Sequence, residues 1–384
     1  MSEVAQVPQL RFPEFSGEWE DGKLGNYGNL INGLTYSPDN IVDDGLLVLR
    51  SSNVQNGQIY LNDNVYVNLD VDDAALTKED DILICVRNGS KRLIGKSTII
   101  NKNLPKSTHG AFMTVFRGES NKFISHWFHS SIYYKEVHKN LGATINSING
   151  SNLKKFKTIF PAKSEQQKIA SFLTVVDTKI EQLSKKQALL SEYKKGLMQQ
   201  IFSQVIRFKV DDGSDFPDWE ERKLGDVGKV YQPKTISQTD LTTKGFDVYG
   251  ANGIIGKYSE YNHEFEQIAV TCRGNTCGTV NFTKPKSWIT GNAMVVNVDD
   301  SKVVNKTFIY YQLSHTNLTY LITGSGQPQI TGDIKTHKVK IPSLPEQTKI
   351  ANFLSSIDNK IEQVGKQLDE SKQFKKALLQ QMFV

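Results

Sequence analysis

The feature that most constrains the fold of this chain is a long segment that occurs twice. Residues 165–202 read EQQKIASFLTVVDTKIEQLSKKQALLSEYKKGLMQQIF, and residues 346–383 read EQTKIANFLSSIDNKIEQVGKQLDESKQFKKALLQQMF. The two segments align without a gap, so that Glu165 corresponds to Glu346 and each later residue to the one 181 positions further on. A duplication with fixed spacing indicates two equivalent structural units, each ending in the same element.

Shorter repeated patterns mark the other boundaries of each unit. The pattern Trp-Glu-x-x-Lys-Leu-Gly begins at Trp19 and again at Trp219, and Phe123-Ile124 recurs as Phe308-Ile309. The offset falls from 200 residues at the two tryptophans to 181 at the long segments, so the first unit is the longer one. The sequences between these boundaries differ. This predicts two units that share a structural frame but bind different ligands.

Both long segments carry the pattern of an α-helix that packs along one seam. Apolar residues recur at alternating steps of three and four, and neither segment contains proline. The seam positions are Ile169, Leu173, Val176, Ile180, Leu183, Leu190, Leu197 and Ile201, and then Ile350, Leu354, Ile357, Ile361, Val364, Leu368, Leu378 and Met382. Lysine interrupts the seam at the equivalent positions 194 and 375. A helix of 38 residues, at about 1.5 Å per residue, is roughly 57 Å long.

Two such helices in one chain can pair with each other, and we expect an intramolecular antiparallel coiled coil. Pairing with a second copy of the chain is the alternative. Outward positions with the same residue in both helices are candidates for a partner surface that is used twice, although a solvated polar face would look the same at any one position. These residues are Lys179, Glu181 and Gln199, with the counterparts Lys360, Glu362 and Gln380.

Outside the long segments the sequence predicts globular modules of mixed α and β structure. Short aliphatic runs bounded by Gly, Asn and Asp predict strands at 46–49, 82–86, 113–116, 268–272 and 294–298. One aromatic-rich helix is expected in each module, at 123–139 and 307–321. The expected fold class is α+β, with two globular α/β domains linked by two long antiparallel α-helices. The boundaries would be 1–160 for the first domain, 161–205 for its helix, 206–341 for the second domain and 342–384 for the second helix.

Polar loops follow several of the predicted strands at parallel positions in both modules. Arg, Asn and Gln side chains hydrogen-bond base edges, and the backbone amides of Gly-rich turns reach phosphates. Turns also favour Gly, Asn and Ser for conformational reasons alone, so a single loop carries little weight. The candidate DNA-binding residues are Arg50, Ser52, Asn53, Arg87, Asn88, Ser90, Lys91 and Arg92, and in the second module Tyr249, Asn252, Arg273, Asn275, Gln327 and Gln329.

Composition limits the cellular setting and the class of partner. The chain has 46 Lys and Arg against 41 Asp and Glu, a net charge of +5 that permits nucleic-acid binding without requiring it. Three cysteines favour reduced thiols and a cytoplasmic location. The opening residues MSEVAQVPQLRF lack the pattern of a secretory signal, and no apolar run is long enough to span a bilayer.

No catalytic or metal-binding motif is convincing. The stretch PDWEERK at 217–223 contains the residue types of a nuclease motif, but its spacing is too short to place the acidic groups on two adjacent strands around a metal. A phosphate-binding loop, a Gly-rich cofactor loop and an Asn/Asp-Pro-Pro-aromatic tetrapeptide are all missing. His126 and His129, like Cys272 and Cys277, lack the further ligands of a zinc site. We therefore predict no catalytic residue and no metal site in this chain.

The duplicated segments resemble those of a known family. The residues that carry the resemblance are Pro161, Glu165, Gln166, Lys168, Ile169, Ala170, Phe172, Leu173, Asp177 and Ile180, which recur as Pro342, Glu346, Gln347, Lys349, Ile350, Ala351, Phe353, Leu354, Asp358 and Ile361. With the two Trp-Glu-x-x-Lys-Leu-Gly edges, this pattern resembles the specificity subunit of type I restriction-modification systems over essentially the whole chain.

The resemblance implies a specific function. Each module would be a target recognition domain that reads one half of an asymmetric bipartite site in double-stranded DNA. The helices would set the half-site spacing and dock two modification subunits, which are adenine methyltransferases, and restriction subunits with nuclease and translocase activity would join them. This chain would bind no cofactor, because S-adenosylmethionine, ATP and Mg would belong to the partner subunits. A non-catalytic coiled-coil adaptor with two protein-binding modules is the alternative.

Overall fold

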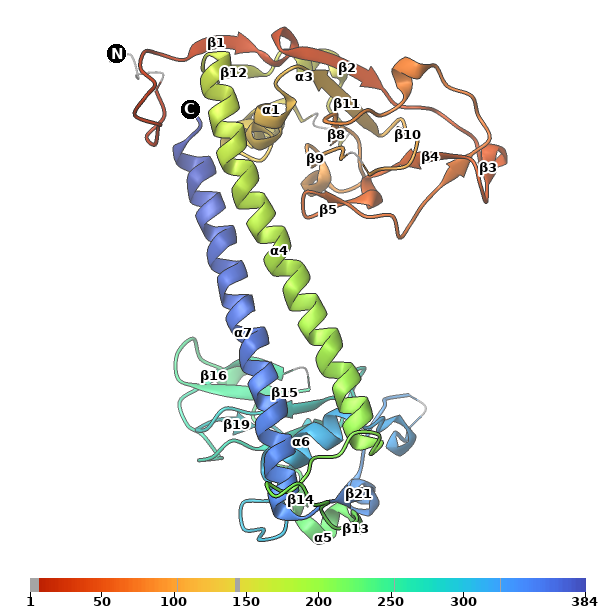
Figure 1. Ribbon diagram of the computed structural model, residues 1–384, viewed down its shortest axis with the longest axis vertical. Helices are drawn as coiled ribbons and strands as arrows, with labels where there is room; N and C mark the ends of the chain where they lie inside the picture. The colour runs from red at the N-terminus through yellow and green to blue at the C-terminus, as the bar shows by residue number, and fades with distance from the viewer. Residues whose placement is uncertain (1–6, 102, 142–145, 252, 325) are drawn as a thin grey trace. The chain divides into compact units, whose positions relative to one another are not determined.

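The computed structural model describes residues 7–101, 103–141, 146–251, 253–324 and 326–384. The chain forms two compact units (Figure 1): unit 1 is Met1–Leu183 with Gln367–Val384, and unit 2 is Ser184–Lys366. Each unit therefore contains part of both long helices, α4 (Lys163–Phe202) and α7 (Leu344–Gln381). These units differ from the sequence-based boundaries, because each globular part buries its core against segments of both helices.

Unit 1 is built on two four-stranded sheets. The first sheet is antiparallel and has the order β2 (Gly28–Asn32), β11 (Met113–Gly118), β8 (Ile82–Cys85) and β9 (Ser97–Ile99). The second has the order β10 (Ser107–His109), β4 (Leu46–Leu49), β7 (Tyr66–Val67) and β3 (Ile41–Val42), with β10 parallel to β4. Two further antiparallel pairs join β1 (Glu20–Lys23) to β12 (Lys157–Phe160), and β5 (Val54–Gln55) to β6 (Gln58–Ile59).

The alternating side chains of β8 separate the two cores of unit 1. Successive residues of a strand point to opposite faces of its sheet. Ile82 and Ile84 pack with the aromatic residues of helices α1 (Asn121–Trp127) and α2 (Ser131–Asn140), whereas Leu83 and Cys85 pack with residues of β4. A short helix, α3 (Gly150–Lys154), precedes β12. The first sheet is thus covered by helices on one face and by the second sheet on the other.

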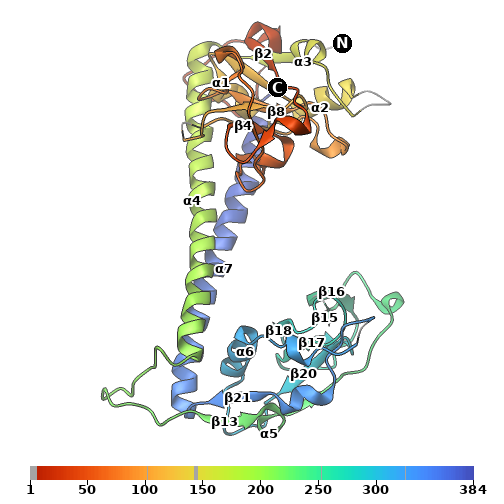
Figure 2. The ribbon, with the colours of Figure 1, turned by 90° about the vertical axis from the view of Figure 1, so that its right-hand side faces the viewer.

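Unit 2 repeats this topology (Figure 2). Its antiparallel sheet has the order β14 (Lys229–Tyr231), β20 (Ala293–Asn297), β17 (Ile268–Thr271) and β18 (Val280–Phe282). A second sheet has the order β16 (Gly253–Tyr258), β15 (Phe246–Gly250) and β19 (Trp288–Ile289), with β15 and β19 parallel as β4 and β10 are. Strand β13 (Glu220–Lys223) pairs with β21 (Lys338–Ile341), and the helices are α5 (Leu224–Val227) and α6 (Lys306–His315).

The structure confirms the predicted strands to within two residues, but it corrects both predictions of an aromatic helix. Residues 123–139 form two helices instead of one: α1 ends at Trp127, and Ser130 caps the start of α2 by accepting a hydrogen bond from the backbone N–H of Tyr133. The predicted helix at 307–321 ends at His315, and a separate 3-10 turn follows at Thr319–Leu321. No helix in the described ranges is long and apolar enough to cross a membrane.

Within each unit the two long helices bury their predicted seams against each other and the domain core. In unit 1, Ile169 and Leu173 of α4 share a core with Leu378 of α7 and with Met382, which directly follows that helix. In unit 2, Ile201 of α4 belongs to the same core as the first turns of α7. The N-terminal part of one helix therefore packs with the C-terminal part of the other in both units.

The lysines that interrupt the seam form ion pairs between the helices. Lys375 Nζ lies 2.5 Å from Asp177 Oδ1 in unit 1, and Lys194 Nζ lies 2.6 Å from Asp358 Oδ1 in unit 2. These two pairs occupy equivalent positions in the duplication, since Asp177 corresponds to Asp358 and Lys194 to Lys375. A charged residue at a seam position commonly fixes the register of two helices, which explains why the interruption occurs in both copies.

Candidate nucleic-acid interface and partner surface

The loop after β8 lies beside the segment that precedes α3 in unit 1. The backbone N–H of Asn88 donates to the carbonyl of Asn146 at 3.2 Å, and the Asn146 amide donates to the carbonyl of Gly89 at 2.8 Å. Arg87 forms an isolated bridge with Ser147. The structure therefore brings together two regions that are about sixty residues apart, and the first of them, residues 87–92, is one of the predicted recognition loops.

The loop at residues 50–53 joins the same cluster. The Asn88 amide donates to Ser51 Oγ at 2.9 Å, and Lys96 Nζ donates to the Ser51 carbonyl at 2.7 Å. Burial lowers the pKa of Lys96. Arg50 forms an ion pair with Asp63 at 2.8 Å and is half-buried, as is Ser52.

Asn53 has a structural position within this loop. Its side chain is fully buried, its Oδ1 accepts from the Arg50 backbone N–H, and its Nδ2 donates to the carbonyls of Tyr60 and Asp63. These bonds hold the loop in its turn, so contact between Asn53 and a DNA base would require the loop to open. The sequence prediction did not separate this buried amide from the exposed ones, because Asn is favoured both in turns and in base recognition.

Unit 2 has an equivalent cluster after β17. Arg273 bridges Gln329, the Gly274 N–H donates to the Pro328 carbonyl at 3.0 Å, and the Ile330 N–H donates to the Cys272 carbonyl at 3.0 Å. In unit 1 the Ile148 N–H makes the matching bond to Val86 at 2.9 Å. The predicted residues Arg273, Asn275, Gln327 and Gln329 are all exposed here.

The loop after β15 also contacts this cluster, but its candidate residue Tyr249 is buried. The hydroxyls of Thr271 and Thr276 donate to the carbonyl of Ala251 at 2.8 and 2.7 Å. Tyr249 is buried in a core with Ile289, and its hydroxyl accepts the backbone N–H of Lys284. Tyr249 is therefore a core residue, and Asn252 lies outside the described residues.

Several basic side chains at these clusters are available for phosphate contacts. Arg87, Ser90, Lys91, Arg92 and Arg273 are exposed. In the part of the chain that the structure describes, none of these Arg or Lys residues forms an ion pair, whereas other arginines such as Arg117 are bound to carboxylates. Unpaired guanidinium and ammonium groups on loops can donate to phosphate oxygens or to guanine.

Sequence analysis missed Phe112, which is 55% exposed beside Arg87. The guanidinium carbon of Arg87 lies 5.6 Å from the centre of the Phe112 ring, a cation–π geometry. The Phe112 carbonyl also accepts the backbone N–H groups of Val86 and Arg87. An aromatic residue directly before a predicted strand is usually part of the core, so Phe112, which follows His109-Gly110-Ala111, was not chosen as a candidate from the sequence.

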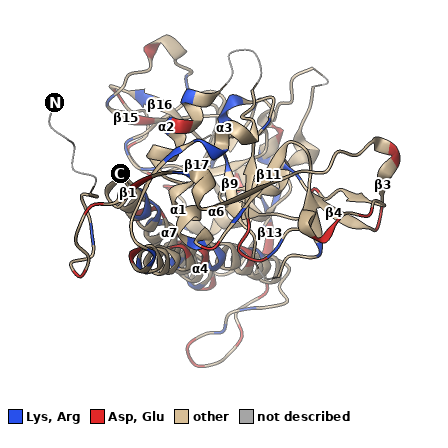
Figure 3. Ribbon diagram, turned by 90° about the horizontal axis from the view of Figure 1, so that it is seen from above, with Lys and Arg blue, Asp and Glu red and all other residues tan. Residues whose placement is uncertain are grey.

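All six predicted partner-surface residues on α4 and α7 are exposed. Figure 3 shows basic and acidic positions on both helices. Two exposed aromatic residues of the same helices were missed from the sequence: Tyr193 is 56% exposed and its counterpart Phe374 is 54% exposed. An exposed aromatic residue at the same position of both copies supports a contact that is made twice.

The most strongly matching residues of the duplication hold the helices to the domains. Glu165 and Glu346 are buried in the first turns of α4 and α7. Arg11 binds Glu165 through contacts of 2.8 and 2.7 Å, and Arg207 binds Glu346 through contacts of 3.2 and 2.9 Å. The carboxylates thus lie at helix N-termini and are neutralised by arginines from outside the helices.

The described residues contain no group of three or more His, Cys, Asp or Glu side chains arranged to hold a metal ion. His126 is buried, and its Nδ1 lies 3.6 Å from Asp177. Burial lowers the pKa of His126 to about 3, with Lys375 and His129 adding to the effect. His126 is therefore a neutral core residue at physiological pH, and Tyr311 takes the equivalent place in unit 2, where its hydroxyl donates to Asp358 at 2.6 Å.

Known proteins resemble this chain over nearly its whole length. The family model described as the type I restriction modification DNA specificity domain matches residues 16–191 and 217–371. The type I restriction enzyme StySPI specificity subunit of Salmonella potsdam is 24% identical over 395 residues, covering 92% of this chain and 85% of the relative. The putative MjaX specificity subunit of Methanocaldococcus jannaschii is 25% identical over 412 residues, covering 98% and 94%. The crystal structure of a type I restriction-modification S subunit from M. genitalium has the same fold, with a TM-score of 0.67 at 17% identity and coverage of 98% and 99%.

Proposed function

We infer the function from a family assignment that is clear: the chain belongs to the specificity subunits of type I restriction-modification systems. Such subunits have no catalytic activity of their own. Each unit would act as a target recognition domain, and unit 1 and unit 2 would read the two halves of one bipartite DNA site. The chain would thus decide where a modification and restriction complex acts.

The observation that carries this proposal is the matching pair of exposed arginine loops. Arg87 and Arg273 occupy equivalent places, each joined to the closing segment of its unit by the same backbone hydrogen bonds. Their surroundings differ: Phe112 lies beside Arg87, whereas Asn292 occupies the corresponding place before β20. A conserved frame with unlike side chains suits two half-sites of different sequence, so the complete site should be asymmetric.

The long helices would form an intramolecular coiled coil that sets the half-site spacing. Half-sites one turn apart, about 34 Å, face the same side of the duplex. Helices of roughly 57 Å are long enough to hold two domains at such a spacing. The exposed residues shared by α4 and α7 would bind two modification subunits, and restriction subunits would complete the complex. S-adenosylmethionine, ATP and Mg would be bound by those partners.

A domain exchange tests this proposal. Residues 20–155 are replaced by the corresponding segment of another specificity subunit, and the variant is assembled with its modification subunits. Methylated positions are then mapped in the DNA of cells that carry the complex. We expect one half of the recognised site to change while the other half stays the same. A change in both halves, or methylation without any sequence preference, would refute the assignment of one half-site to each unit.

A further inference from the structure

The turn between β10 and β11 in unit 1 carries an exposed aromatic side chain beside Arg87. We propose that this residue, Phe112, determines one base of the half-site read by unit 1, because its ring contacts the methyl group of a thymine next to the guanine that Arg87 binds. This inference rests on the proposed function and names bases that one recognition domain would select. Its support comes from the geometry of the two side chains and from the matching turn of unit 2.

Hydrogen bonds fix the backbone of Phe112 on both sides. The N–H of Met113 donates to the carbonyl of Gly110 at 2.8 Å and closes the turn. The carbonyl of Phe112 accepts the N–H groups of Val86 and Arg87 at 3.0 and 3.1 Å, which joins the turn to the loop after β8. A ring that is 55% exposed on such a fixed backbone loses little conformational entropy when it binds a ligand. Phe112 thus has the properties of a preorganised contact residue.

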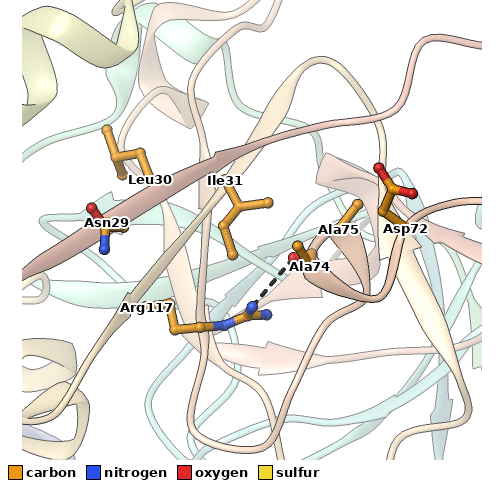
Figure 4. A pocket seen from close by; sticks show the side chains of 7 residues that line it. All are labelled: Asn29, Leu30, Ile31, Asp72, Ala74, Ala75 and Arg117. Atoms are coloured by element: carbon orange, nitrogen blue, oxygen red, sulfur yellow. Dashed lines mark hydrogen bonds between the residues drawn. The ribbon is translucent and has the colours of Figure 1, made fainter.

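The ring of Phe112 also positions Arg87. The guanidinium carbon lies over the ring, 5.6 Å from its centre, and both side chains are exposed. An arginine that packs on an aromatic face keeps N–H donors at its edge, and these can bind O6 and N7 of one guanine together. Arg117 on β11 is the opposite case, since its guanidinium group is bound by Asp81 and by the carbonyl of Ala74, the second of which is drawn in Figure 4. Arg117 is thereby a structural residue, whereas Arg87 is available to DNA.

The separation of the two groups suits two adjacent base pairs. Successive base pairs lie about 3.4 Å apart along the duplex. With 5.6 Å between the guanidinium carbon and the ring centre, Arg87 and Phe112 can reach neighbouring positions in the major groove. Apolar side chains there contact the methyl group that distinguishes thymine from the other bases. The pair would therefore select a thymine adjacent to a guanine.

The surroundings of Phe112 favour DNA over an apolar protein surface. The ring lies beside the loop after β8, on which Arg87, Lys91 and Arg92 are exposed. Its binding partner must therefore accept hydrogen bonds from basic side chains and also offer an apolar contact. The major groove combines the two, because phosphates and guanine accept from Arg and Lys while the thymine methyl is the apolar group at the base edges.

Unit 2 has the same turn with a different side chain. The N–H of Ala293 donates to the carbonyl of Thr290 at 3.1 Å, which repeats the turn before β11. Asn292 takes the place of Phe112, and its carbonyl accepts the N–H of Cys272 at 2.9 Å. An asparagine can hydrogen-bond N6 and N7 of adenine, whereas a phenylalanine can recognise only the thymine methyl. The shared backbone therefore presents a different base-reading group in each unit.

The test uses the complex of the full chain with its modification subunits, bound to duplex DNA that carries the site found by methylation mapping. In the half-site that the domain exchange assigns to unit 1, the thymine next to a guanine is replaced by deoxyuridine, which lacks only the methyl group. We expect about fourfold weaker binding, the size of one buried methyl group. Deoxyuridine in the half-site of unit 2 is the control for the DNA. A half-site of unit 1 in which no thymine lies next to a guanine in either strand would overturn the inference.

A protein variant shows whether Phe112 is the residue that contacts this methyl group. The variant Phe112→Ala should bind DNA with thymine and DNA with deoxyuridine equally well. Asn292→Ala alters the equivalent turn of unit 2 and should keep the fourfold difference in the half-site of unit 1. If Phe112→Ala binds more weakly but still discriminates between the two bases, Phe112 only supports the loop, and the inference is wrong.

Crosslinking gives a second readout that does not depend on the base. A photoreactive benzoylphenylalanine at position 112 keeps the aromatic ring in its place. We expect a crosslink to DNA within the half-site of unit 1. A crosslink to a modification subunit instead of DNA, or a DNA-bound complex without a crosslink to DNA, would overturn the inference.

The outcomes separate this inference from the proposed function. If the unaltered complex methylates DNA without a bipartite site, the proposed function fails, and the inference fails with it. If the site is bipartite but the unaltered complex binds thymine and deoxyuridine alike, only the inference about Phe112 fails.

Discussion

The buried carboxylate of Glu346 is held mainly by one arginine. Arg207 contacts both carboxylate oxygens, and Trp219 Nε1 donates to Glu346 Oε2 at 3.3 Å. The Glu346 side chain is 0% exposed and that of Arg207 is 23% exposed. We therefore expect the variant Arg207→Met, which keeps an apolar side chain of similar length, to leave an uncompensated charge in the interior of unit 2.

The size of the loss can be derived from this environment. Removing one partner of a buried ion pair costs about 3–5 kcal/mol. The first turn of α7 stabilises the remaining carboxylate through its N-terminal dipole, which offsets about 1 kcal/mol. The expected decrease in the free energy of unfolding is thus about 2–4 kcal/mol. In unit 1, Arg11→Met should decrease the free energy of unfolding more than Arg207→Met does in unit 2. Glu165 receives no hydrogen bond from Trp19, whose Nε1 lacks a partner among the described residues.

Urea-induced unfolding at pH 7, followed by tryptophan fluorescence, measures these losses. The control is the double variant Arg207→Met/Glu346→Gln, in which the neutral amide can still accept from Trp219. If the buried charge is responsible, the double variant recovers most of the stability lost in Arg207→Met. A decrease below about 1 kcal/mol in the single variant, as is typical of exposed pairs, would refute the reasoning. So would a double variant that is no more stable than the single one.

Four further predictions follow from other contacts. Lowering the pH from 7 to 5 should decrease the free energy of unfolding by about 2 kcal/mol through His126, because its folded pKa of about 3 lies below the ordinary 6.5 and only the unfolded chain binds the proton in this window. The variant His126→Gln should show a smaller decrease in urea titrations. Arg273→Ala should weaken specific DNA binding without lowering the melting temperature, and unchanged affinity would remove it from the interface. In the free chain, Gln347→Met should lower the melting temperature more than Gln166→Met, since Gln347 loses three hydrogen bonds and Gln166 loses one. Inserting seven residues between Leu183 and Ser184 of α4 should change the half-site spacing in methylation maps or abolish activity, and methylation at the original spacing would contradict the proposed role of the helices.

The sequence predicted the long helices well because their signal is repeated many times. A seam of eight apolar positions, without proline, fixes both the period and the face of each helix. Their observed bounds differ from the duplicated segments by two residues or fewer. The break between α1 and α2 was harder to see, because Ser130 acts through a single capping bond within a continuous aromatic run.

The candidate interface clusters could be predicted only in part. The exposed arginines were identified from loop composition, which is a local property. Which loops meet depends on sheet order, and that order is set by contacts between distant strands such as β8 and β11. For the same reason composition could not show that Asn53 and Tyr249 are buried, or that Phe112 lies beside Arg87.

The duplication supplies an internal comparison that a single domain would lack. Positions with the same contacts in both units, such as Asp177 with Lys375 and Asp358 with Lys194, belong to the frame that the two units share. A position whose contacts differ while its neighbours stay the same requires a separate explanation. Gln166 and Gln347 are such a pair, since both bind the preceding proline carbonyl but only one has its oxygen satisfied by the chain. The difference lies outside the long helices, because the backbone N–H of Asn305, the N-cap of α6, reaches Gln347 Oε1, whereas Gln166 Oε1 has no hydrogen-bond partner among the described residues although Ser120 is the N-cap of α1.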